Sequence, residues 1–90
     1  MNGYPSVSPS VRMPEEFRFL CMLHNVGATD PERSLSVQEI ARWTDKEVPM
    51  IRDYLQKLQE LGYVQPIISN ETEKYHVSIM GIRKVLTLYS

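Results

Sequence analysis

The spacing of hydrophobic residues predicts a helix in the first part of the chain. From Phe17 to Val26, apolar side chains recur every three or four positions and cover most of the circumference of such a helix. Pro14 suits the first turn of a helix, and Gly27 suits the left-handed position that ends one. Because one small core covers only part of this apolar surface, the helix is also expected to contact a second subunit.

Two further helices are predicted between Ser36 and Gly62. Ser36 and Glu39 form an S-x-x-E capping box, which begins a short helix with Trp43 packed at its end. A longer helix begins near Pro49, since proline is tolerated in a first turn, and ends at Gly62, which suits a left-handed cap. Its inward stripe consists of Ile51, Leu55 and Leu58, and its outward face of Met50, Arg52, Asp53, Gln56, Lys57 and Glu60.

The last third of the chain predicts a β-hairpin followed by a helix. Residues 63–68 and 74–79 form two strands that a turn at 69–72 joins, and Pro66 restricts the first strand to a sheet edge because proline has no amide to donate. Ser34 and Leu35 supply a minimal additional strand. In the strand at 74–79, alternation places Tyr75, Val77 and Ile79 on one side and Lys74, His76 and Ser78 on the other. The closing helix has a stripe of Ile82, Val85, Leu86 and Tyr89.

Composition and charge narrow the class of protein. The 90 residues are 42% hydrophobic and 23% charged, which is typical of one ordinary globular domain. No apolar run reaches the roughly 20 residues that span a bilayer, and the single cysteine excludes an internal disulfide, so a cytoplasmic protein without a membrane segment is expected. The formal net charge is -1, so any nucleic-acid binding must come from local charge placement.

The sequence contains no catalytic or metal-binding motif. It has no phosphate-binding glycine loop, nucleophile elbow or H-E-x-x-H motif. Cys21 lies on the apolar stripe of the first helix, where a thiol behaves as a small hydrophobe. His24 and His76 alone do not supply the four ligands of a structural zinc site. We therefore expect no enzymatic activity, no cofactor and no metal.

The beginning of the chain predicts a flexible N-terminal arm. Residues 1–13 are rich in Gly, Pro, Ser and Asn, which offer little surface to bury, so the folded domain is expected at residues 14–90. The arm is either a disordered tail or a segment that packs on a second subunit or reaches a DNA groove through Arg12.

Three segments resemble the winged helix-turn-helix superfamily, as in small bacterial and archaeal transcription regulators. They are SVQEIARWT from Ser36, IRDYLQKLQELGYV from Ile51 and YHVSIMGIRKVL from Tyr75. The second is the most specific, because such a helix passing directly into a strand is typical of the recognition helix and its exit. The third is similar to the family's threonine-x-x-glycine passage, with Ser78 and Gly81 at those places. The resemblance implies an α+β, mostly helical fold: a three-helix core, a small antiparallel sheet with a hairpin wing, and a C-terminal helix.

The resemblance also implies a function: a transcription regulator that binds specific double-stranded DNA as a homodimer. The third helix would enter the major groove and the wing would contact the backbone. The implied site residues are Lys46, Met50, Arg52, Gln56 and Lys57 for the helix, and Asn70, Thr72 and Lys74 for the wing. The expected dimer interface uses the first and last helices, through Phe19, Leu23, Val85, Leu88 and Tyr89.

The local charges leave a second interpretation open. In the segment 44–57, the cations Lys46, Arg52 and Lys57 are balanced by Asp45, Glu47 and Asp53, and on the wing Glu71 and Glu73 outnumber Lys74. Since duplex affinity comes mostly from neutralised phosphates, this surface predicts weak DNA binding by a monomer. Arg52 and Gln56 either read guanine and adenine or form a polar pair on a solvated face. The alternative function is a winged-helix protein interaction module, as a subunit or adaptor.

Overall fold

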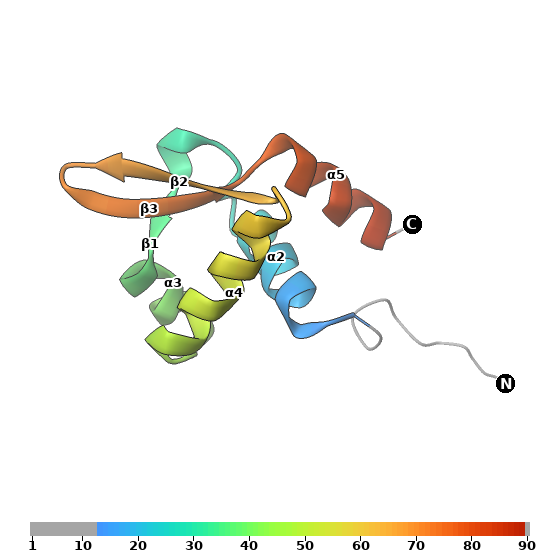
Figure 1. Cartoon of the computed structure of the whole chain (residues 1–90), viewed down its shortest axis with the longest axis horizontal. Helices are drawn as coiled ribbons and strands as arrows, with labels where there is room; N and C mark the ends of the chain where they lie inside the picture. Colours follow the sequence, from blue (N-terminus) through green and yellow to red (C-terminus); the bar gives the residue numbers. More distant parts are fainter. Residues whose placement is uncertain (1–12, 90) are drawn as a thin grey trace, which may run out of the picture.

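The computed structural model describes residues 13–89, so the expected arm lies outside the described residues except for Met13. The first half contains α2 (Glu15–Asn25), the 3-10 turn η1 (Pro31–Arg33), β1 (Leu35–Ser36) and α3 (Val37–Thr44). The second half contains α4 (Val48–Glu60), β2 (Val64–Ser69), β3 (Thr72–Val77) and α5 (Ile79–Leu88). Figure 1 shows the helices α2, α3 and α4 clustered beneath the sheet, with α5 leading away from its end.

The described part of the chain has the winged helix-turn-helix fold that the sequence predicts. The three strands form one antiparallel sheet in the order β1-β3-β2, and the β2–β3 hairpin extends beyond the helices as the wing (Figure 1). Pro66 lies in β2, opposite Tyr75 of β3, and β2 is an edge strand as expected. The missing amide of Pro66 therefore faces no further strand of the sheet.

The hydrophobic core is shared by the helices and one face of the sheet. Its fully buried side chains come from α2, α3, α4, β3 and α5: Leu20, Leu23, Ile40, Ile51, Leu55, Leu58, Val77 and Val85. Met13 packs against this core, although the sequence assigns it to the arm. None of the described helices is both long enough and apolar enough to cross a membrane.

Three residues of the expected dimer interface belong to this core. Phe19, Leu23 and Val85 are 3%, 0% and 1% exposed, so side chains of the same chain already cover them. They are not available to a second subunit in this fold, and the predicted interface needs correction. Leu88 is half-buried against the core, and Tyr89 keeps 53% of its surface exposed.

The helix ends follow the predicted local chemistry. The Glu39 amide donates to Ser36 Oγ at 3.2 Å, and the Ser36 amide donates to Glu39 Oε1 at 2.9 Å, which completes the capping box. This backbone donor is the main reason that the pKa of Glu39 is lowered. Gly27 and Gly62 adopt φ values of +90° and +82°, and these left-handed positions end α2 and α4.

Two expectations for single residues are wrong. Trp43 is 63% exposed, because α3 buries Val37 and Ile40 and turns the indole away from that face. Ile79 is 72% exposed, because β3 ends at Val77 and Ser78 already acts as the N-cap of α5. In both cases apolar character alone does not show where the element ends or which face is covered.

Ser78 and Gly81 connect the end of α4 to the sheet and to α5. Ser78 Oγ donates to the Gly62 carbonyl at 2.7 Å and accepts from the Gly81 amide at 3.0 Å, while the Ser78 amide donates to the Tyr63 carbonyl at 2.9 Å. Gly81 is buried against the backbone of Tyr63. A Cβ atom at Gly81 would collide with the Tyr63 carbonyl oxygen and lie 2.7 Å from a methyl group of Val77.

The substitution Gly81→Ala is therefore expected to destabilise the fold. The obstacle is a backbone carbonyl that cannot rotate away, so the free energy of unfolding should fall by about 3 kcal/mol, as for a severe overpacking change. Urea denaturation followed by circular dichroism measures it. Thr87→Ala, at an exposed position of the same helix, is the control and should change stability by less than about 1 kcal/mol. Equal effects of the two changes would contradict the close approach at Gly81.

Candidate nucleic-acid interface

The outward face of α4 is fixed by the residues that α4 buries. Ile51, Leu55 and Leu58 point into the core with at most 1% of their surface exposed. Helical geometry then directs the intervening side chains to solvent. These exposed residues are Met50, Arg52, Asp53, Gln56 and Lys57, and Met50 retains 46% of its surface. The structure thus places four of the five helix residues implied by the resemblance on one exposed face.

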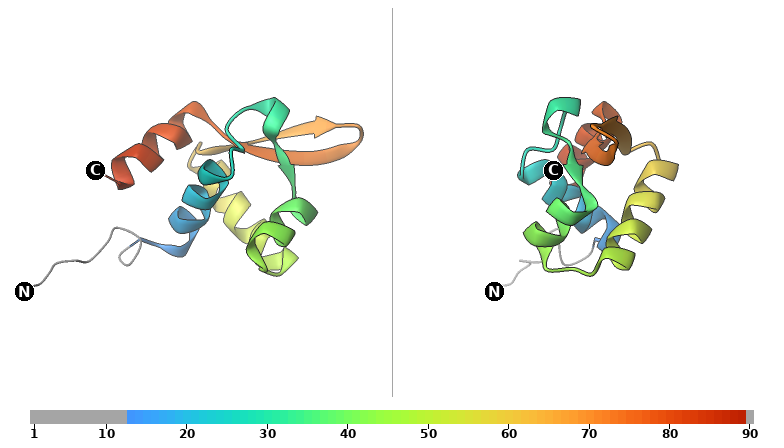
Figure 2. Two further views of the ribbon diagram at one scale, coloured as in Figure 1. Left: turned by 180° about the vertical axis from the view of Figure 1, so that it is seen from behind. Right: turned by 90° about the vertical axis from the view of Figure 1, so that its left-hand side faces the viewer.

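The wing is a regular hairpin with a two-residue turn. Ser69 pairs with Thr72, and the turn residues Asn70 and Glu71 have φ values of +52° and +64°. Left-handed conformations at both positions match the twist of the flanking strands. Seen from the wing side, the hairpin lies above α3 and α4 (Figure 2, right).

A groove lies between the start of α3, the face of α4 and the wing. Its hollow measures about 360 Å³ and is lined by Val37, Gln38, Arg52, Glu71, Thr72, Glu73 and Tyr75. Arg52 is the one cation of this lining, and Glu71 and Glu73 are its two carboxylates. We refer to these seven residues as the wing groove. Because the lining has one cation and two carboxylates, it favours a polar ligand that is not bound through positive charge alone.

Tyr75 carries a buried phenol at the edge of the wing groove. Its hydroxyl donates to Glu73 Oε1 at 2.7 Å, so the carboxylate is held in one orientation along the wing. Burial, together with the hydrogen bond and the negative charge of Glu73, raises the pKa of Tyr75 to about 12. Arg52 lines the same groove, and its positive charge acts in the opposite direction on the pKa of Tyr75.

Three predicted cations, Lys46, Lys57 and Lys74, lie outside the wing groove. Lys46 directs its ammonium over the ring of Tyr54, 5.8 Å from the centroid, and it borders a hollow on the side of α2. Lys74 of β3 is half-buried and is not among the residues that line the wing groove. Its charge helps to lower the pKa of Glu39. Arg52 and Lys57 remain as the exposed cations of α4.

The remaining predicted residues lie along the wing and α4. Thr72 lines the wing groove, and Asn70 occupies the exposed tip of the turn. Gln56 follows Arg52 after one helical turn on the same side of α4. Gln38, Val37 and Tyr75 complete the groove, although the sequence did not single them out. Only the capping box, which fixes where α3 begins, could have indicated that Gln38 belongs to an exposed first turn.

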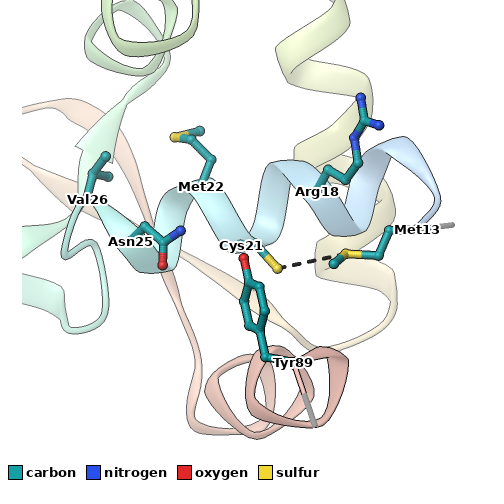
Figure 3. A pocket seen from close by; sticks show the side chains of 7 residues that line it. All are labelled: Met13, Arg18, Cys21, Met22, Asn25, Val26 and Tyr89. Atoms are coloured by element: carbon teal, nitrogen blue, oxygen red, sulfur yellow. Dashed lines mark hydrogen bonds between the residues drawn. The ribbon is translucent and has the colours of Figure 1, made fainter. Parts of the chain in front are cut away.

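A second hollow lies between α2 and α5, on the side of the chain ends. It measures about 260 Å³ and is lined mostly by apolar and sulfur-containing side chains (Figure 3). The buried Cys21 thiol lies 4.0 Å from the Met13 sulfur, and its contact with Tyr89 is the main cause of the raised pKa of that phenol. Within residues 13–89, no cluster of three or more His, Cys, Asp or Glu side chains is placed to hold a metal ion.

The fold is similar to that of solved MepR and TubR structures, whereas no family model and no curated protein matches the sequence. A mutant of MepR from S. aureus superposes with a TM-score of 0.72 at 16% identity over 84% of this chain. A second MepR mutant, bound to an oligodeoxyribonucleotide, gives 0.70 at 15% identity. The chain spans 54% of the length of each MepR chain. The DNA-binding TubR fragment from Clostridium botulinum gives 0.71 at 20% identity, with 82% of this chain and 93% of the fragment covered.

The raised pKa of Tyr75 predicts an alkaline pH dependence of stability. The unfolded phenol titrates near 10 and the folded one near 12, so its stabilising contribution is present below pH 10 and is lost as the pH rises through 12. Tyr75→Phe should be about 1 kcal/mol less stable at neutral pH, because the hydrogen bond to Glu73 is lost. The difference from the wild type should shrink between pH 10 and pH 12 in urea titrations. A constant difference over this range would contradict the assignment.

Proposed function

We propose that this chain is a DNA-binding transcription regulator that acts as a homodimer, with α4 in the major groove and the wing along the backbone. The observation that carries the proposal is the exposed face of α4 beside a projecting wing. The similarity of fold to MepR bound to an oligodeoxyribonucleotide and to the DNA-binding TubR fragment supports it. These neighbours also support a role other than catalysis.

Arg52 and Gln56 are the proposed readers of bases. They lie one turn apart on the exposed side of α4. A guanidinium suits the O6 and N7 acceptors of guanine, and a carboxamide suits the N6 and N7 positions of adenine. Lys57 and Asn70 would contact phosphates, since they lie toward the end of α4 and at the wing tip. Met50 would supply an apolar contact near the start of the helix.

Useful affinity for DNA requires two copies of the chain, because one copy presents few cations to the phosphates. The salt dependence of duplex binding has a slope near -0.9 for each phosphate neutralised, so Lys57, the one cation of α4 assigned to phosphate, predicts a slope of only about -1 for one copy. Glu71 and Glu73 of the wing groove oppose the approach of phosphates. Two copies on adjacent half-sites would double the favourable contacts and read a two-fold symmetric sequence.

We place the dimer contact on one flank of α5. Ile79, Ile82, Leu86 and Tyr89 follow the chain at spacings of three, four and three residues and form an apolar stripe, which we call the apolar flank. Ile79, Leu86 and Tyr89 are 72%, 59% and 53% exposed. Because α5 and the wing extend in opposite directions, a contact along α5 leaves α4 and the wing accessible (Figure 1). This flank replaces the core residues Phe19, Leu23 and Val85 as the proposed interface.

The first test is a duplex-binding titration over salt after selection from random sequences. Arg52→Ala should cost about 1–3 kcal/mol of binding free energy and relax the preference at one base position, because a bidentate contact is lost. Lys57→Ala should weaken all sequences evenly and reduce the salt slope by about one. Arg33→Ala removes a cation with 71% of its side chain exposed in η1, and it is the control because Arg33 belongs neither to α4 nor to the residues that line the wing groove.

Failure of the wild type to bind any duplex at low salt would reject the DNA function. The second candidate function, a protein interaction module, would then be favoured. The carboxylates of the wing groove suit contact with a polar or basic protein surface better than contact with phosphates. Equal losses for Arg33→Ala and Arg52→Ala would instead remove the assignment of α4 as the reader.

The second test addresses the apolar flank. Ile79→Glu introduces a charge into the proposed interface and should raise the dimer dissociation constant by about tenfold or more. The new carboxylate lies in the first turn of α5, where the helix dipole favours it, so folding should be retained. Met80→Glu makes the same charge change on the next, 58% exposed residue and is the control, because Met80 lies about 100° around α5 from Ile79, outside the apolar flank. Sedimentation equilibrium measures both. A wild-type monomer at all concentrations would refute the homodimer.

A further inference from the structure

The side of α5 next to the apolar flank carries positive charge. Met80, Arg83, Lys84 and Thr87 recur at helical spacing, and with Tyr63 they line a hollow of about 390 Å³. We call these five residues the cationic flank. Lys84 is half-buried, and its Nζ lies 5.0 Å from the centroid of the Phe17 ring, which favours one position of the ammonium. Arg83 is exposed and has no ion pair among the described residues.

The cations of this flank have no carboxylate beside them in the hollow that they line, whereas other cations of the molecule do. Arg42 shares its hollow with Glu39, Arg52 shares the wing groove with Glu71 and Glu73, and Arg18 is paired with Glu15 at 3.0 Å. By contrast, no carboxylate lines the hollow of the cationic flank. The sequence from position 74 to position 90 contains no aspartate or glutamate at all. A chain with a net charge of -1 thus keeps an unbalanced positive patch on one helix.

We propose that the cationic flank binds an acidic segment of a partner protein that also carries an apolar side chain. Arg83 would hold a carboxylate through two parallel hydrogen bonds, and Lys84 would add a second positive charge. Met80 is 58% exposed, and its flexible thioether, beside the half-buried ring of Tyr63, would receive the apolar side chain. The interface therefore combines charge complementarity with an apolar anchor.

A protein segment fits this surface better than a second duplex of DNA does. Exposed Met80 and the ring of Tyr63 offer apolar area that a phosphate backbone would leave uncovered. The flank also belongs to α5, which extends away from the wing (Figure 1; Figure 2, left). It is therefore separate from the proposed DNA surface and does not depend on that proposal.

A random peptide display library, selected against the full chain at low salt, tests the proposal without assuming a partner. Enriched peptides should combine aspartate or glutamate with an aliphatic or aromatic residue. On addition of a selected peptide, backbone amide resonances of α5 and Tyr63 should shift, whereas those of the wing should not. No enrichment, or enriched peptides that lack carboxylates, would overturn the proposal.

Charge reversal supplies the matched comparison. Arg83→Glu with Lys84→Glu should weaken the selected peptides by about tenfold or more, because both charge-assisted contacts become repulsive. Arg33→Glu with Arg42→Glu makes the same total charge change on η1 and α3 and should leave peptide affinity within about twofold. If circular dichroism shows that loss of the Lys84 contact with Phe17 unfolds the chain, Arg83→Glu alone serves as the test.

A duplex-binding measurement on the same variants distinguishes a protein ligand of the cationic flank from a nucleic-acid ligand. The reversal at Arg83 and Lys84 should leave the duplex affinity of the full chain within about twofold, since these residues lie outside α4 and the wing. If the reversal instead abolishes duplex binding and spares the peptides, the flank is a nucleic-acid surface and the proposal is wrong. Equal peptide binding by both double variants would also overturn it.

Discussion

The hydrogen bonds of Ser78 determine how the parts of the molecule are oriented. One hydroxyl joins the Gly62 carbonyl at the end of α4 to the Gly81 amide at the start of α5, and the Ser78 amide binds the Tyr63 carbonyl before β2. Since β3 runs directly into Ser78, the position of the wing relative to α4 depends on the same few atoms. The shape of the wing groove, and the direction in which α5 leaves the sheet, follow from this junction.

Local chemistry explains why much of the fold was predictable from the sequence. The Ser36 and Glu39 pair, the left-handed Gly62 and the edge position of Pro66 each depend on neighbouring residues or on one missing amide, and all three were confirmed. Trp43 and Ile79 were not predictable in the same way. Their exposure depends on how elements distant in sequence cover them, and hydrophobic periodicity does not contain that information.

The candidate site was only partly predictable for the same reason. Helical spacing identified the exposed face of α4, but it did not show that Lys46 lies over Tyr54 or that Lys74 is not part of the groove lining. The two flanks of α5 could not be predicted for a similar reason. Hydrophobic periodicity predicts which side of a helix faces the core, but it does not show how the exposed side is divided into apolar and charged parts. The packing of Gly81 against Tyr63 sets the rotation of α5 and thereby separates its apolar and cationic sides.

The backbone conformation of the wing turn bears on the negative charge that the turn carries. Asparagine tolerates a left-handed backbone because its short polar side chain hydrogen-bonds locally, whereas a longer side chain in this conformation costs roughly 1 kcal/mol relative to glycine. Glu71 occupies the second such position of the turn, with φ +64°. The hairpin therefore carries a negative charge at the place where its backbone would fold more easily without a side chain. The strands, and not the turn, must supply the stability that keeps the wing in register.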